Sequence, residues 1–198
     1  GRSSINFQYK HHAGQETRID PSVSNIVDVY LLERTYDNLY RIWLQDEGTK
    51  PSVSTSDQLR INYSGALNPL KSLSDQIIYH PVKYKILFGA NAEEELQATF
   101  KIVKNPKTNI SDAVIKTRVV AAINEFFALD NWDFGDTFYF TELTAYIHNQ
   151  LAPDLLTAVI VPNQSGQSFG SLFQVDSAAD EIFISGATVD DVTTITAL

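Results

Sequence analysis

Residues Asn124–Leu151, NEFFALDNWDFGDTFYFTELTAYIHNQL, say most about how this chain folds. Eight of these 28 residues are aromatic, and the stretch holds one His and no Cys, Lys or Arg. Catalysis generally needs positioned acids, bases or nucleophiles, whereas cores and interfaces need large apolar side chains. The composition therefore favours packing over chemistry.

Two predicted helices flank a loop in this part of the chain. From Ser111 to Leu129 apolar residues recur at helical spacing, and Ser111 or Asn109 can act as the N-cap. A second helix is predicted over Thr141–Gln150, and Pro153 stops it. The stretch therefore predicts two packed helices joined by an aromatic loop.

Four aromatic residues lie in or beside that loop, namely Trp132, Phe134, Phe138 and Tyr139. Packing in the core is the ordinary role of such residues. The stretch holds more aromatic residues than the apolar stripes of two helices need, and aromatic anchors on loops mark partner surfaces. We therefore take these four residues as interface candidates, with core packing as the alternative.

Strand and helix patterns continue on both sides of this stretch. Helices are predicted over Thr35–Leu44 and Asp57–Leu67, and His80-Pro81 is predicted as a turn. Alternating or β-branched runs predict strands at Ile5–His11, Ile26–Leu32, Val82–Phe88, Leu96–Val103 and Leu155–Val161. From Val27 to Val161, with consecutive helices counted as one helical segment, the order is β-α-β-β-α-β, which is the split βαβ order of ferredoxin-like α+β folds.

The residues after 163 differ from this α+β core. Short strands are predicted at Leu172–Val175 and Glu181–Ser185, with a third at Val189–Ile195. The sequence thus predicts an N-terminal strand or extension over residues 1–20, a core domain over 21–163, and a small β-rich C-terminal subdomain over 164–198.

Composition restricts the classes of function. The 198 residues carry a net charge of −9 with scattered basic residues, so we expect no nucleic-acid binding. The chain has no Cys, which excludes disulfides and thiolate metal sites. It lacks an apolar run of ~18 residues, so we expect no membrane span. Met is also absent, which predicts a fragment or a processed chain of a longer protein.

Candidate chemistry is sparse. The four His residues lack metal-binding spacing, and no nucleophile elbow or P-loop occurs. Asp130, Asp133 and Asp136 faintly resemble a calcium loop, but Trp132 and Phe134 occupy two of the ligand positions. We therefore expect no enzymatic activity, no cofactor and no small-molecule substrate. A hydrolase, or a metal- or sugar-binding domain using these three Asp residues, is the alternative.

Long segments of the chain resemble the baseplate wedge protein six of T-even-like contractile-tailed phages, which is related to the J-like baseplate proteins. The resemblance lies mainly in NEFFALDNWDFGDTFYFTELTAYIHNQLAP (Asn124–Pro153) and FGSLFQVDSAADEIFISGATVDDV (Phe169–Val192). INFQYKHHAGQETRIDPSVSNIVDVYLL (Ile5–Leu32) and TYDNLYRIWL (Thr35–Leu44) are also similar.

The resemblance implies a structural role in the virion. Members of this family form dimers, and the dimers join into a ring around the hub of the tail baseplate, which is assembled in the host cytoplasm. This chain would be the C-terminal part, with itself and other wedge proteins as partners. The family supplies no catalytic residues.

Overall fold

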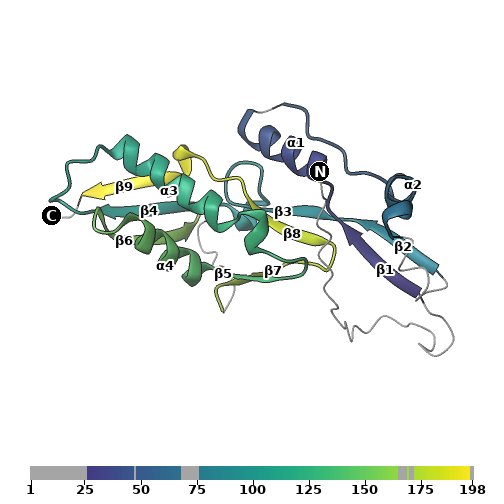
Figure 1. The fold of residues 1–198 in the computed structure, drawn as a ribbon. Helices are drawn as coiled ribbons and strands as arrows, with labels where there is room; N and C mark the ends of the chain where they lie inside the picture. The colour runs from purple at the N-terminus through teal and green to yellow at the C-terminus, as the bar shows by residue number, and fades with distance from the viewer. Residues whose placement is uncertain (1–25, 47, 68–75, 165–168, 170–171, 197–198) are drawn as a thin grey trace.

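The computed structural model describes residues 26–46, 48–67, 76–164, 169 and 172–196, and these residues form a mixed α+β fold (Figure 1). The strand predicted at Ile5–His11 lies outside them. In chain order the helices and strands are β1 (Ile26–Leu31), α1 (Arg34–Asp46), α2 (Ser56–Leu67), β2 (Gln76–Pro81), β3 (Lys83–Leu87), β4 (Ala98–Lys104), α3 (Asp112–Phe126), β5 (Thr137–Tyr139), α4 (Phe140–Leu151), β6 (Leu155–Pro162), β7 (Gln174–Asp176), β8 (Glu181–Ser185) and β9 (Val192–Thr196).

A nearly continuous strand, β2 followed by β3, changes partner at Val82. β2 pairs in parallel with β1, and the Val82 N–H still donates to the Leu31 carbonyl at 3.0 Å. One residue later, the Lys83 N–H donates to the Asp180 carbonyl at 2.8 Å, and β3 pairs in parallel with β8. The single long strand thus joins two sheets end to end, which gives the molecule its elongated form (Figure 1).

The three-stranded sheet β6-β4-β9 forms the far end of the molecule, with β4 antiparallel to β6 and parallel to β9. Phe100 and Ile102 of β4 are fully buried, whereas Lys101 between them is exposed, so side chains alternate between two faces. α3 and α4 pack over the buried face (Figure 1). Ser111 caps α3 as predicted, with its hydroxyl accepting from the Val114 N–H at 3.4 Å.

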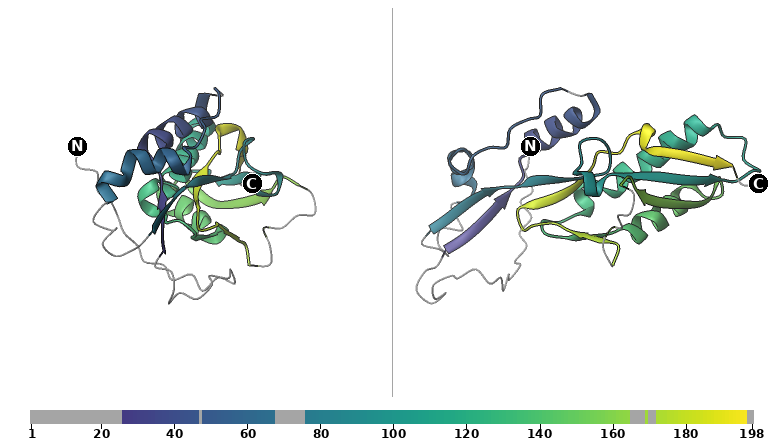
Figure 2. Two further views of the ribbon diagram at one scale, coloured as in Figure 1. Left: turned by 90° about the vertical axis from the view of Figure 1, so that its right-hand side faces the viewer. Right: turned by 180° about the vertical axis from the view of Figure 1, so that it is seen from behind.

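Two further layers complete the fold. α1 places Tyr40 against Tyr84 and Ile86 of β3, and this second core includes residues of β8. α2 covers β2 through Leu59, Leu67 and Tyr79. We call β1, β2 and α2 the arm, and we call β3 to β9 with α3 and α4 the body. The right view in Figure 2 shows the arm extending from the body.

A sharp turn at Phe88 and Gly89 directs the chain into the body. Both residues have positive φ, 64° and 71°. A Cβ on Gly89 would lie 1.9 Å from the Gly186 carbonyl oxygen, so only glycine fits this crossing. The turn carries the Phe88 ring into the main core, with its centroid 4.9 Å from that of Phe100. Phe88 thus adopts a positive φ, which is strained for a residue other than glycine, and in this conformation its ring lies at the centre of the core.

Most predicted elements are present, but their pairing differs from the expected pattern. The α+β class is confirmed, whereas the ferredoxin-like order is not, because β1 pairs only with β2 among the described strands and β3 pairs with β8. The turn predicted at His80-Pro81 is wrong, since both residues end β2. Proline is tolerated there because it is the last residue of the strand.

The strands predicted after residue 163 are β7, β8 and β9, and they pair with β5, β3 and β4. Each of these C-terminal strands pairs with a strand that lies before residue 164, so the sheets contain residues from both sides of that predicted boundary. A run of β-branched and aromatic residues predicts a strand, but the partner depends on contacts distant in sequence.

Candidate interaction surfaces

Trp132 lies at the junction of two cores and is half-buried. Its ring stacks on Phe127 at 5.4 Å and meets Phe183 edge-on at 5.2 Å. Its Nε1–H donates to the Phe126 carbonyl at 2.8 Å. The half-buried Trp132 ring covers these neighbours, and its indole N–H already has a hydrogen-bond partner in the protein. This contact set gives Trp132 a packing role, so little of its ring remains for a partner.

The interface candidate Phe138 lies in the core. Its exposed fraction is 0%, and its ring centroid is 4.8 Å from that of Phe140. The adjacent Tyr139 is 39% exposed. Both belong to β5, a strand that the sequence did not predict, and neighbouring strand residues point to opposite faces. Phe138 is therefore too buried to contact a partner, and its selection as an interface candidate was wrong. Phe134 is partly buried against the second core. Tyr139 is the most accessible of the four candidates.

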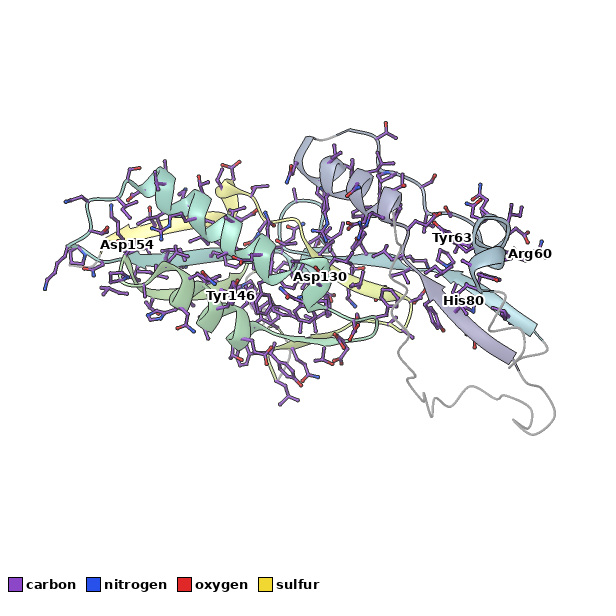
Figure 3. The ribbon with its side chains drawn as sticks, viewed as in Figure 1. Arg60, Tyr63, His80, Asp130, Tyr146 and Asp154 are labelled. Carbon is purple, nitrogen blue, oxygen red and sulfur yellow. The ribbon has the colours of Figure 1, made fainter. Side chains whose placement is uncertain are left out.

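The three loop aspartates do not converge on a metal site. The Asp136 carboxylate accepts from the Asp133 N–H at 2.7 Å, and the Ser177 hydroxyl donates to the Asp136 carbonyl at 2.8 Å. Asp130 is exposed (Figure 3). Within the described part of the chain, no group of three or more His, Cys, Asp or Glu side chains could hold a metal ion. The Asp136 carboxylate instead accepts a backbone hydrogen bond within its own loop, as Asx turns do.

The most buried charged group of the described residues holds α1 on β3. Asp37 is 7% exposed and accepts from Arg41 Nε at 2.8 Å and from the Tyr84 hydroxyl. Burial and the hydrogen bond to Asp37 raise the pKa of the Tyr84 phenol far above its usual range. Burial, followed by the charge of Tyr36, raises the pKa of Tyr40 to about 12. Because each group faces a partner inside the protein, this network stabilises α1 without presenting a reactive group.

Two lowered carboxyl pKa values mark the tip of the body. Hydrogen bonds from Thr108 and Arg118 lower the pKa of Asp154 (Figure 3). Hydrogen bonds from Lys104 and Thr194 lower the pKa of Asp112. These pairs connect β4, α3 and β9, so we interpret them as structural ion pairs and caps at the surface.

Polar and ring contacts hold the arm together and join α2 to the segment before α1. His80 Nε2 lies 3.0 Å from Asp28 Oδ1, and its ring stacks on Tyr30 at 5.0 Å (Figure 3). The Tyr63 hydroxyl of α2 donates to Glu33 Oε1 at 3.1 Å. The pairing of His80 with Asp28 runs between the two strands of the arm, so its geometry is that of a structural contact.

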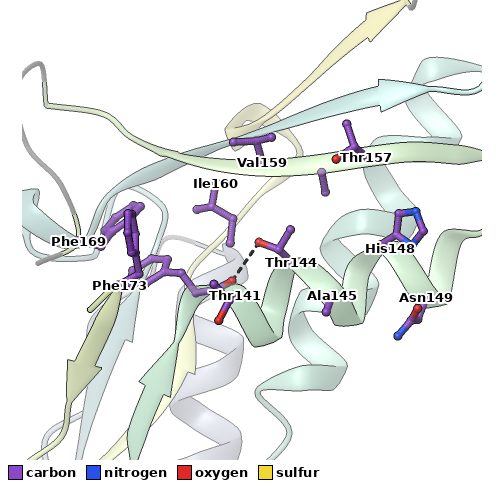
Figure 4. Close-up of a pocket in the computed structure, with 12 residues that line it drawn as sticks. Thr141, Thr144, Ala145, His148, Asn149, Thr157, Val159, Ile160, Phe169 and Phe173 are labelled. Carbon is purple, nitrogen blue, oxygen red and sulfur yellow. Dashed lines mark hydrogen bonds between the residues drawn. The ribbon is translucent and has the colours of Figure 1, made fainter. Parts of the chain in front are cut away.

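A long groove of about 540 Å³ runs between α4 and β6 (Figure 4). Thr157 to Ile160 of β6 form one wall, and Thr141, Thr144, Ala145 and His148 of α4 form the other. Phe169 and Phe173 close one end, and Phe173 is 52% exposed. Sequence reasoning missed this groove because its walls come from a helix and a strand whose approach depends on the fold.

A second, smaller hollow of about 460 Å³ lies along α1. Leu39 and Ile42 line it and are 51% and 54% exposed, together with Trp43 and the segment 48–52. The Lys50 ammonium lies 5.3 Å from the Trp43 ring centroid, which is a cation–π distance. The helical spacing of apolar residues predicted α1 itself, but it placed Leu39 in the same stripe as the buried Tyr40, whereas Leu39 is 51% exposed. It did not single out the exposed pair Leu39 and Ile42.

The charges of the chain are distributed unevenly. Residues 119–198 contain eleven Asp or Glu residues and no Lys or Arg, whereas residues 1–118 contain 13 acidic and 15 basic residues. The first of these regions includes α4 and β6, which form the two walls of the groove. Counting charge by region, in addition to the total, would have shown this asymmetry from the sequence.

Comparison of the chain with protein-family models and with curated proteins finds no match. No helix among the described residues is long and apolar enough to cross a bilayer.

Proposed function

We propose that this chain is a structural subunit of a contractile phage tail baseplate, namely the C-terminal part of a wedge protein that acts by protein–protein assembly. The observation that carries this proposal is the resemblance of Asn124–Pro153 and Phe169–Val192 to the wedge family. On this proposal the chain works in the virion, and its partners are a second copy of itself and neighbouring wedge proteins. This proposal depends only on the α+β class of the fold and does not require a ferredoxin-like topology.

The distribution of side chains supports a role in contacts. The buried Asp37 accepts hydrogen bonds from Tyr84 and Arg41, and Asp136 accepts from a backbone N–H in its own loop. Each of the two hollows, on α1 and beside β6, is lined by exposed apolar residues, namely Leu39 and Ile42 at the first and Val159 and Phe173 at the second. Apolar surface of this kind marks sites of association. Nothing in the part of the chain that the structure describes favours the alternative of a hydrolase or a metal- or sugar-binding domain.

Leu39 and Ile42 form the surface on which self-association is best tested. Both lie on the outer face of α1, so changing them leaves the buried Tyr40 face intact. Replacing both with Glu should weaken a dimer at this surface by about tenfold or more, because burying a carboxylate against an apolar patch is costly. Ile61→Glu on α2 is the matched control, since Ile61 is 73% exposed and lies on the arm.

Light scattering over a range of concentrations measures association, and thermal unfolding checks that each variant is folded. We expect a dimer for the unchanged chain and a shift to monomer for the double variant only. Purification of the full-length protein from infected cells with its neighbouring tail proteins tests the wedge role directly. A strict monomer at high concentration, together with no co-purifying tail protein, would contradict the proposal. Micromolar calcium binding measured by calorimetry would favour the alternative.

A further inference from the structure

α1 carries a row of residues at the spacing found where two helices pair. The row consists of Thr35, Leu39, Ile42 and Asp46, at intervals of four, three and four residues. Positions at these intervals share one face of a helix, and the same intervals separate the contact positions of paired helices. Thr35, Leu39 and Ile42 are exposed. Since α1 packs on β3 through Tyr40 and lies on the outside of the molecule (Figure 1), these three residues are open to a partner.

The charges at the two ends of α1 oppose its own dipole. Of the four charged residues of this helix, Asp37 and Arg41 form an ion pair at 2.8 Å, while Arg34 is the first residue and Asp46 the last. The N-terminus of a helix carries partial positive charge and the C-terminus partial negative charge. A cation at the start and an anion at the end are therefore both unfavourable within the single helix.

A second copy of α1 in antiparallel orientation removes both conflicts. With a twofold axis midway between Leu39 and Ile42, Leu39 of each copy meets Ile42 of the other. Thr35 and Asp46 are equally distant from this axis, so the start of each helix lies beside the end of the other. Asp46 then meets the positive end of a helix together with the exposed Arg34 and Thr35.

The end charges select both the orientation and the occupant. A parallel pair would keep the apolar contacts, but it would place Arg34 beside Arg34 and Asp46 beside Asp46, which like-charge repulsion opposes. Reciprocal contacts of the antiparallel kind require the same row of residues on both partners. Lys50 is the other charge at this hollow, and it lies over the Trp43 ring, outside the row. The charges of α1 are thus complementary to those of a second α1.

We propose that two copies of this chain associate through antiparallel α1 helices about a twofold axis, with Leu39 against Ile42 at the centre and Arg34 and Thr35 against Asp46 at each end. This inference rests on the self-association proposed above and specifies its geometry. α1 has 13 residues and is about 20 Å long, so the helix pair is a small interface. The dissociation constant should accordingly be on the order of micromolar.

Engineered cysteines test the orientation in the whole chain, which has no Cys of its own. Thr35→Cys and Asp46→Cys are prepared separately, mixed and oxidised. In the antiparallel pair position 35 lies beside position 46 of the other copy, whereas two positions 35 are about 16 Å apart, beyond the reach of a disulfide. We expect at least about tenfold more crosslinked dimer in the mixture than in either variant alone. Asn62→Cys, at an exposed position of α2, is the matched control and should crosslink with neither.

Charge reversal tests the pairing of the helix ends. Arg34→Glu and Asp46→Lys should each weaken association by about three- to tenfold, measured by sedimentation over a range of concentrations. The double variant should return to within about twofold of the unchanged chain, because opposite charges face each other again. Each single change suits the dipole of its own helix, so the unfolding midpoint should stay equal or rise. Arg60→Glu on α2 is the matched control, since Arg60 is also exposed, and it should change association by less than about twofold.

Each result bears on a separate claim. Crosslinking of each cysteine variant with itself, and not in the mixture, would overturn the antiparallel arrangement in favour of a parallel one. Failure of the double variant to restore association would overturn the reciprocal charge pairing. A strict monomer would overturn the inference and assign this face to another protein, while co-purification with tail proteins would still support the baseplate role. The expected crosslinks without co-purifying tail proteins would contradict only the baseplate role.

Discussion

The body and the arm use the same kinds of strand and helix but differ greatly in how much they bury. Among the residues that the structure describes, the main core of the body contains 21 buried residues, including Phe88, Phe100 and Phe138, whereas the core under α2 contains Leu59, Leu67 and Tyr79. Since local stability follows buried apolar contact, the arm should open at lower free energy than the body. The comparison teaches that one continuous strand, β2 with β3, can join two regions of unequal stability.

The largest expected effect on stability is at Gly89, where the backbone passes close to that of Gly186. Gly89→Ala should destabilise the protein by about 4 kcal/mol or more, because its Cβ would overlap the Gly186 backbone and its φ is +71°. Denaturant unfolding of the variant and of the unchanged chain measures the difference. A loss below about 1 kcal/mol would show that this crossing adapts and that the body is less rigid than its packing indicates.

Trp132→Ala tests where the body ends and a partner surface begins. Loss of its ring contacts should lower stability by about 2–4 kcal/mol, less than for a fully buried aromatic because Trp132 is only half-buried. Tyr139→Ala is the matched control and should cost less than about 1 kcal/mol, since Tyr139 is exposed. If Trp132→Ala kept the unfolding midpoint and weakened only self-association, the packing role would be wrong and the interface role right.

Alkaline pH should act on the layer between body and arm. Burial raises the pKa of Tyr40 to about 12, and the unfolded phenol titrates near 10. The folded state therefore holds a proton that the unfolded state releases, so the contribution of Tyr40 to stability should be constant below about pH 10 and should be lost between about pH 10 and 12. Thermal unfolding against pH, with phenolate absorbance followed in parallel, checks the window.

Tyr84→Phe separates the hydrogen bond from the titration. It should lower stability at neutral pH by about 1–2 kcal/mol, because buried Asp37 loses one donor, and it should reduce the alkaline fall. An alkaline fall of unchanged size would show that the tyrosines under α1 do not cause it.

The smallest expected effect is a gain in the arm. Gly65 is exposed in α2, and a Cβ there would meet nothing within 4 Å. Gly65→Ala should stabilise the arm by about 0.5–1 kcal/mol, because alanine loses less backbone entropy in a helix. Hydrogen exchange should show increased protection in α2 and β2 with the body unchanged. An equal increase in the body would mean that arm and body unfold as one cooperative unit.

The candidate surfaces were only partly accessible to sequence reasoning. A loop was expected around Phe138 because three residues are too short to show alternation, yet β5 forms there by pairing with β7, 35 or more residues later in the chain. That pairing buries Phe138 and exposes Tyr139. The groove beside β6 was invisible for the same reason, although each of its two walls was predicted separately.

Local pattern alone determined several elements of this protein. The periodicity of α3 and α4, the cap at Ser111, and the apolar run of β6 are properties of neighbouring residues, so the sequence predicted them directly. Tertiary structure alone decided that β3 takes β8 as its partner, that Phe88 adopts a strained turn, and that the edge of β6 stays open beside α4. The physical reason is that helix period and strand alternation come from backbone geometry, whereas strand partners and burial depend on which distant segments fill the same core.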